Sequence, residues 1–311
     1  MANPRTELHD PPVLRADVPR TRAELRAVGI SDSCLGREHT RLLRGQWLHG
    51  AVAPEARHFL LAALQRSPDD AFLTRQTAAA VHGGVVPSEG VIHVGTASDR
   101  RVRTPGMTLH RYAQRPDVVM VDGLPVTTKP QTFVDLGAVL GLVDLVVLGD
   151  SFSRGAPGMP EELRRHTAAS HGRGVVAARS AATLVRVGAE SAQETRTRLL
   201  MVLAGLPEPV LQHPMYDVHG RQVHRLDIAH PDALLAIEYD GDHHLDRRQR
   251  DRDLLRREKF EASGWRFVIA VTADIHQRPA PFLDRVVVAS RERGIAVPKR
   301  LDPRWQLHFG R

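Results

Sequence analysis

The chain lacks several features that would assign it to a protein class. Its 311 residues include one cysteine, Cys34, so neither an internal disulfide nor a cysteine-based zinc site can form. The best apolar run, 134–148, is interrupted by Asp135, Gly141 and Asp144, and no membrane span is expected. The first residues have no apolar core, so a secretory signal is not expected either. A reducing, cytoplasmic compartment fits these absences.

Lysine is also scarce: Lys129, Lys259 and Lys299 are the only lysines among 43 basic residues. The net charge is +7 and the isoelectric point about 10.4, which makes a polyanion such as nucleic acid a candidate partner. An arginine excess is also typical of GC-rich genomes, so charge alone does not decide. The composition, 42% apolar and 25% charged, indicates a globular protein of two or three domains.

The pattern of turns and periodicity predicts a mixed α/β (α+β overall) chain in six segments. They are a loose arm (1–19), a winged-helix or helix-turn-helix region (20–54), a mixed α+β middle region (55–150), a helical connector (151–188), a C-terminal domain (189–295) and a tail (296–311).

The winged-helix prediction rests on two helix starts followed by a strand or hairpin at 46–53. A capping box, Thr21 to Glu24, opens the first helix, and Ser31 caps a second that runs to about Leu43. Arg37, Arg41 and Arg44 would then share one face of the second helix and could contact phosphates. The alternative is an ordinary solvated helix face.

The C-terminal domain has the predicted order α-β-β-β-α-β. A helix begins after Ser191, and another spans about 245–263; the strands are 210–216, 222–229, 235–240 and 265–272, with a last helix at about 282–293.

A short loop joins the second and third of these strands, which we expect to pair as a hairpin. In that register Asp227 lies opposite Glu238, and Arg225 lies opposite Asp240. All four would point to one face. The alternate residues would form the core-facing side: Leu226, Ile228, Ile237 and Tyr239.

Two facing carboxylates repel each other unless something positive lies between them. Hard cations such as Mg²⁺ accept carboxylate oxygens and retain water ligands, so Asp227 and Glu238 are candidate ligands for Mg²⁺ or Mn²⁺. The alternative is that Arg225 alone neutralises the pair in a surface salt-bridge cluster.

Together these residues resemble the PD-(D/E)XK nuclease superfamily, and more narrowly its very-short-patch-repair-like (Vsr-like) endonuclease branch and a related bacterial domain family. The resemblance covers about 189–293, a restriction-endonuclease-like core. It implies metal-binding roles for Asp227, Glu238 and the helix residue Glu194. Glu194 is equally well explained as part of a capping box with Ser191.

The sequence departs from the superfamily at Asp240, where a lysine is usual. The Vsr-like branch implicates histidines after the Asp-Gly pair, which makes His243 and His244 candidates for a general base here. Phosphate-binding candidates are Arg225 and three arginines on the following helix, Arg248, Arg252 and Arg256; a solvated helix face is the alternative for these three.

Residues 21–148 more loosely resemble the type IV abortive-infection antitoxin (AbiEi-like) family, through Leu42-Leu-Arg44-Gly45-Gln-Trp47 and Thr77 to Gly83. That resemblance implies a DNA-binding winged helix. Our main hypothesis is therefore a metal-dependent DNA endonuclease. The alternatives are a non-catalytic DNA-binding regulator with a degenerate nuclease fold, and a nuclease that acts on RNA.

Overall fold

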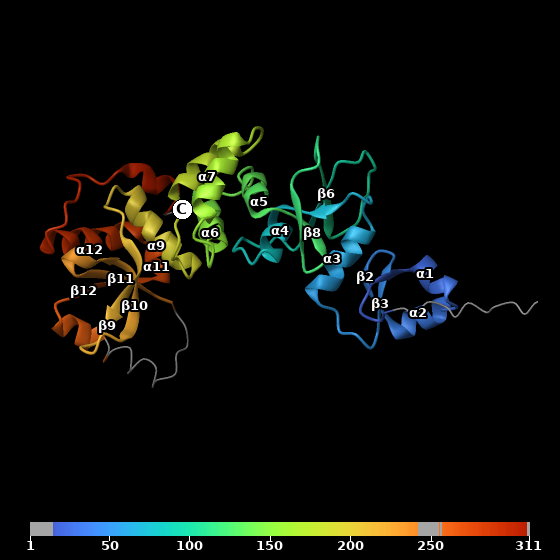
Figure 1. Ribbon diagram of the computed structural model, residues 1–311, viewed down its shortest axis with the longest axis horizontal. Helices are drawn as coiled ribbons and strands as arrows, with labels where there is room; N and C mark the ends of the chain where they lie inside the picture. The colour runs from blue at the N-terminus through green and yellow to red at the C-terminus, as the bar shows by residue number, and fades with distance from the viewer. Residues whose placement is uncertain (1–14, 242–254, 256, 310–311) are drawn as a thin grey trace, which may run out of the picture. The chain divides into compact units, whose positions relative to one another are not determined.

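The computed structural model describes residues 15–241, 255 and 257–309. As the sequence predicts, helices and strands are mixed, and the sheets contain both parallel and antiparallel pairs (Figure 1). The chain divides into two compact units: unit 1 is Met1–Val81 with Ser88–Thr132, and unit 2 is His82–Pro87 with Phe133–Arg311.

Unit 1 begins with the region predicted to be a winged helix. Its elements are β1 (Arg20–Thr21), α1 (Arg22–Ala27), α2 (Asp32–Glu38), β2 (His39–Leu43) and β3 (Gln46–His49), and the strands form a sheet of order β1-β3-β2. The helix starts are those predicted. Thr21 and Glu24 form a reciprocal capping box, and the Ser31 side chain accepts a hydrogen bond from the backbone N–H of Cys34.

The predicted length of the second helix is wrong. Helix α2 ends at Glu38, because the chain turns extended at His39 (φ −133°) and pairs with β3. This hairpin buries Leu42 against Leu48 and Ala62. Arg37 therefore lies on α2, Arg41 on β2 and Arg44 in the turn beside Gly45, so the three do not share a helix face. All three remain exposed.

The rest of unit 1 packs helices against a five-stranded sheet of order β6-β5-β4-β8-β7. The elements are α3 (Ala56–Gln65), β4 (Phe72–Leu73), α4 (Arg75–Val81), β5 (Ile92–Thr96), β6 (Met107–Arg111), β7 (Val118–Val121) and β8 (Leu124–Thr127). The predicted Asp122-Gly123 turn joins β7 to β8, with positive φ at both residues. The core includes Leu73, Val94 and Val126, all fully buried.

The longer part of unit 2 begins within α5 (Lys129–Leu136), whose residues are divided between the two units. Three further helices follow: α6 (Leu142–Phe152), α7 (Met159–Ala169) and α8 (Val175–Leu184). Helix α6 is buried along nearly its whole length, which explains why its sequence is so apolar. No helix in the described part of the chain is both long enough and apolar enough to cross a membrane.

The remainder of unit 2 has the predicted α-β-β-β-α-β order. It consists of α9 (Ala192–Leu203), β9 (Val210–Tyr216), β10 (Gln222–His230), η1 (Pro231–Ala233), β11 (Leu235–Asp240), helical residues 257–262, β12 (Arg266–Val271), α11 (Thr272–His276), α12 (Pro279–Glu292) and η2 (Pro303–Leu307). The sheet order is β12-β11-β10-β9, with β11 and β12 parallel. Helix α9 packs on β10 and β11, and α12 packs on β12 (Figure 1).

Candidate functional site

The site is built on the hairpin of β10 and β11. The turn closes through η1 and Leu234, which adopts a left-handed conformation (φ +49°). The register is the one predicted: Ile228 pairs with Ile237, and His230 with Leu235. Asp227 and Glu238 are the next residues along the two strands, so they lie where the regular pairing ends.

The expected core residues of the hairpin are only partly confirmed. Leu226, Ile228 and Ile237 are fully buried. Tyr239 is only half-buried, and its hydroxyl forms a hydrogen bond of 2.9 Å with Thr272 Oγ1. Ala229 is fully buried too, which means that the sheet is covered on both faces and that burial does not alternate strictly along β10.

Two glutamates act on the Asp227 carboxyl at the end of this hairpin. The pKa of Asp227 is raised to about 7, first by burial and then by the negative charges of Glu194 and Glu238. A hydrogen bond from the Tyr239 backbone N–H and the nearby His224 lower the pKa of Asp227, but by less than burial and the two glutamates raise it. An acidic group in such an environment is typical of functional sites.

Glu194 is positioned by α9. Ser191 caps this helix by accepting a hydrogen bond from the Glu194 backbone N–H, as the capping hypothesis predicts. The Glu194 side chain, however, accepts from the Glu190 backbone N–H (2.9 Å) and from the Gln212 side chain (3.0 Å). Gln212 has a positive φ of +52°, a conformation that costs energy in a residue other than glycine and that often marks functional sites.

Two basic side chains flank Glu238. His224 Nε2 is 3.4 Å from Glu238 Oε1, and Arg257 Nη2 is 3.9 Å from Glu238 Oε2. The His224 ring stacks on Phe260, with ring centroids 5.8 Å apart. Neither His224 nor Arg257 was singled out from the sequence; the position of His224 three residues before Asp227 on one strand was the only available signal.

Arg225 does not neutralise the acidic pair. Its guanidinium forms an ion pair of 2.6 Å with Glu190, in the segment that leads into α9. Asp240 is exposed at the end of β11. The salt-bridge alternative, in which Arg225 alone balances Asp227 and Glu238, is therefore not what the structure contains.

The metal-ligand set is smaller than the sequence suggests. Within residues 15–241, 255 and 257–309, no group of three or more His, Cys, Asp or Glu side chains is gathered closely enough to hold a metal ion. Mg²⁺ needs only one or two carboxylates and retains several waters, so the chemistry of Asp227 and Glu238 fits such an ion. The other predicted residues, His243, His244, Arg248, Arg252 and Arg256, lie outside the described residues.

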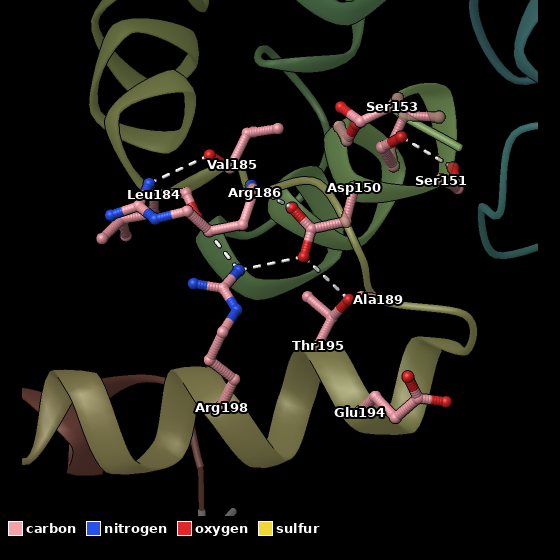
Figure 2. A network of polar contacts seen from close by, with 12 residues as sticks. Asp150, Ser151, Ser153, Leu184, Val185, Arg186, Ala189, Glu194, Thr195 and Arg198 are labelled. Atoms are coloured by element: carbon pink, nitrogen blue, oxygen red, sulfur yellow. Dashed lines mark hydrogen bonds and ion pairs between the residues drawn. The ribbon is translucent and has the colours of Figure 1, made fainter. Parts of the chain in front are cut away.

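A buried ion pair, also missed from the sequence, fixes α9 against α6. Arg198 and Asp150 are 2.9 Å apart and essentially inaccessible to solvent. Figure 2 shows Arg198 and Thr195 extending from α9 to the Asp150 carboxylate, while Glu194 stands apart from this network. The burial of Asp150 raises its pKa, and Arg198 acts against that rise. The network anchors the helix that carries Glu194.

Known proteins offer limited comparisons. No family model matches the chain. The crystal structure of the RV2827C protein from Mycobacterium tuberculosis has a TM-score of 0.39 and 15% identity, over 58% of this chain and 75% of that one, a likeness too weak to support an argument.

Two curated proteins of the same organism are closer in sequence. The uncharacterized protein Rv2248 of strain H37Rv is 32% identical over 213 residues, which are 68% of this chain and 78% of that protein. The uncharacterized protein MT2308 of strain CDC 1551 matches equally well. The chain belongs to the family of these two mycobacterial proteins.

Proposed function

We propose that the protein is a metal-dependent endonuclease that hydrolyses phosphodiester bonds in DNA. The observation that supports this most is the position of Asp227, a largely buried carboxyl whose pKa two neighbouring glutamates help to raise to about 7. Such a group is electrostatically unfavourable when ionised. A divalent cation at the same place would remove the conflict.

Asp227 and Glu238 are the residues that would hold the ion, and Glu194 adds negative charge to the same place. Bound Mg²⁺ or Mn²⁺ supplies positive charge that offsets the charge of the phosphate and favours ionisation of a water molecule. The donor set consists of carboxylates, which is the set that these hard cations prefer.

Basic side chains close to the carboxylates would bind the phosphate. Arg257 and His224 already approach Glu238, and Arg225 lies on the same strand as Asp227. A guanidinium is suited to bidentate contact with phosphate oxygens. In this proposal they would take the role of the lysine that the resemblance expects at position 240.

The test is cleavage of duplex DNA with and without Mg²⁺ or Mn²⁺. The wild-type protein should cleave only when the metal is present, and Asp227→Asn should abolish cleavage. Asp232→Asn is the matched control, since this exposed aspartate lies in the loop of the same hairpin and its loss should leave cleavage unchanged. Metal-dependent cleavage that survives Asp227→Asn would overturn the assignment of the site.

The second candidate is a non-catalytic DNA-binding regulator. It is favoured by Asp240 in place of lysine and by the exposed arginines Arg41 and Arg44 on the β2–β3 hairpin. Sequence-selective binding that weakens steeply with salt, without cleavage under either metal, would support it. Cleavage of single- or double-stranded RNA but not of DNA would instead support the nuclease site with RNA as its substrate.

A further inference from the structure

Strand β7 of unit 1 (Val118–Val121) is an exposed edge of the five-stranded sheet. It stands last in the order β6-β5-β4-β8-β7 and pairs antiparallel with β8. All of its residues are apolar, and two of them are largely accessible: Val119 is 40% exposed and Met120 is 66% exposed. An exposed apolar edge strand is a ready template for pairing with another strand.

The other edge strands in the described part of the chain carry features that usually prevent such pairing. Strand β9 contains Pro214, and β1, β2, β6 and β12 each contain an arginine. On β12 arginines also cover the backbone, because Arg266 donates to the Phe267 carbonyl (2.8 Å) and Arg285 donates to the Ile269 carbonyl (3.1 Å). Charged side chains and proline are the common protection of sheet edges. Among the edge strands described, β7 alone contains neither.

The backbone groups of Val118 and Met120 face the open edge of β7. In an antiparallel pair, successive residues alternate between facing the partner strand and facing away from it. The Thr128 N–H donates to the Asp117 carbonyl (3.1 Å), which places Asp117 among the residues that face β8. Pro125 agrees with this phase, since it lies opposite Met120 and has no N–H to donate to β7. The N–H and C=O groups of Val118 and Met120 are thus left to solvent or to a further strand.

We propose that β7 pairs with β7 of a second copy of this chain, antiparallel across a two-fold axis, so that two five-stranded sheets join into one. A symmetric partner of this kind satisfies both edges with the same surface. The pairing buries Val119 and Met120 of both copies and supplies partners for the free backbone groups. It uses unit 1 alone, goes beyond the proposed nuclease activity and does not depend on it.

A single register uses all of the free groups. With Val118 of one copy opposite Met120 of the other, the two residues exchange both backbone hydrogen bonds, and Val119 lies on the axis opposite its own counterpart. A shift that sets Val118 opposite Val118 would bring Met120 against Pro116, which has no N–H to give. The reverse shift, with Met120 opposite Met120, would bring Val118 against Asp122 in the turn.

The charges around β7 favour a second copy as the partner. Each end of the strand has one exposed acidic and one exposed basic residue: Asp117 and Arg115 before it, and Asp122 and Arg57 at the turn after it. Both arginines donate to backbone carbonyls, Arg115 to that of Asp70 and Arg57 to that of Asp122. Neither forms an ion pair with a carboxylate among the described residues. In the proposed register Asp117 approaches the turn that holds Arg57 of the second copy, and Asp122 approaches Arg115.

The test measures the oligomeric state of the full-length protein by analytical ultracentrifugation over a wide range of concentration. Val119→Lys and Val119→Glu each place two like charges opposite each other on the axis, which is unfavourable in a sheet. Mixing the two variants places a lysine opposite a glutamate. Val176→Lys is the control, because Val176 is a 73% exposed valine on α8 of unit 2.

We expect a monomer–dimer equilibrium for the wild type and for Val176→Lys. Each charged variant of Val119 should dimerise at least about tenfold more weakly, and an equal mixture of the two should recover the dimer. This recovery shows that the variants are folded. It is also specific to a two-fold axis at Val119.

Hydrogen exchange of backbone amides, followed by NMR, tests the register. The amides of Val118 and Met120 should exchange more slowly as the protein concentration rises, whereas that of Val119, which already faces β8, should not respond. A wild type that is monomeric at every concentration would overturn the proposal. A dimer that persists equally in both charged variants, or a mixture that does not recover it, would overturn it as well.

Discussion

The backbone N–H of Tyr239 on β11 donates a hydrogen bond to the carboxylate of Asp227 on β10. This bond lies one residue beyond the last regular pair of the hairpin, Ile228 with Ile237. The bond lowers the pKa of Asp227, whereas the negative charges of Glu238 and, from α9, Glu194 raise it. One hydrogen bond is not enough to offset burial and two like charges, so the pKa of Asp227 stays well above its ordinary value.

The pH dependence of stability should reveal this conflict. The pKa of Asp227 in the folded protein, about 7, is above its ordinary value of 3.8, so the folded state binds more protons than the unfolded state between these two values. The contribution of Asp227 to stability is therefore favourable at low pH and is lost as the pH rises through about 7.

Asp227→Asn removes this titration. We expect the variant to be more stable than the wild type at pH 8, by about 1–3 kcal/mol, with a smaller difference at pH 5. Urea unfolding at both pH values measures the effect, and Asp232→Asn serves as the control. At each pH the stability of the wild type is compared with that of Asp227→Asn. If the wild type fell further behind the variant at pH 5 than at pH 8, the environment described for Asp227 would be wrong.

The buried ion pair of unit 2 should be worth far more than a half-buried ion pair on the same helix. Arg198→Met leaves the Asp150 carboxylate buried without its cation, which should cost about 3–5 kcal/mol. Arg196→Met breaks the more accessible ion pair with Asp144 and should cost about 1 kcal/mol or less. Urea unfolding of the two variants makes the comparison. Equal losses would show that the Asp150 network does not anchor α9.

Two stacked histidines of unit 1, His93 and His110, should make stability depend on pH in the opposite direction. The pKa values of His93 and His110 are lowered from 6.5, that of His110 to about 4, so the unfolded state binds more protons within this window. Stability should be full above about pH 6.5 and decline as the pH falls toward 4. Burial is the main cause of both shifts, to which the charge of Arg75 adds, whereas Glu89 opposes the shift of His93.

His110→Gln keeps a polar side chain that does not titrate. Thermal unfolding between pH 4 and 7 should show a shallower decline in this variant than in the wild type. His171→Gln is the control, because that histidine is exposed and lies in unit 2. A decline of the same steepness in all three proteins would argue against a neutral, buried pair.

The β2–β3 hairpin should contribute to DNA binding through charge. Arg41 and Arg44 are exposed on it, and each phosphate contact adds about one to the slope of log K against log salt concentration. Arg41→Gln with Arg44→Gln should reduce that slope by about two in fluorescence anisotropy titrations. The control is Arg164→Gln on α7 of unit 2. An unchanged slope in the double variant would exclude a role for the hairpin.

Local signals in the sequence were sufficient for most of the C-terminal α-β-β-β-α-β region. Strands β9 and β11 have the predicted bounds, and the β10–β11 register follows from a short loop that leaves little freedom. The prediction failed at the end of α2, which was expected to continue to about Leu43 before Gly45 but ends at Glu38. The burial of Leu42 and the pairing of β2 with β3 compete with a longer helix. Both depend on residues outside the stretch of sequence that predicted the helix.

The contacts that matter most at the sites could not be predicted, because they join distant residues of ordinary type. Asp150 and Arg198 are separated by 48 positions, and neither belongs to a motif. The approach of Arg257 to Glu238, and of His93 to His110, depends on how whole elements pack. Asp227 and Glu238 were accessible from sequence because a single hairpin brings them together.

The most direct test of the central claim is the anomalous diffraction of Mn²⁺ in crystals of the protein soaked with this ion. We expect an anomalous peak at about 2.0–2.3 Å from carboxylate oxygens of Asp227 and Glu238 in the wild type, and none at that place in Asp227→Asn. Fully soaked wild-type crystals with no peak between these two side chains, or the same peak in the variant, would contradict the claim that this hairpin holds a divalent cation.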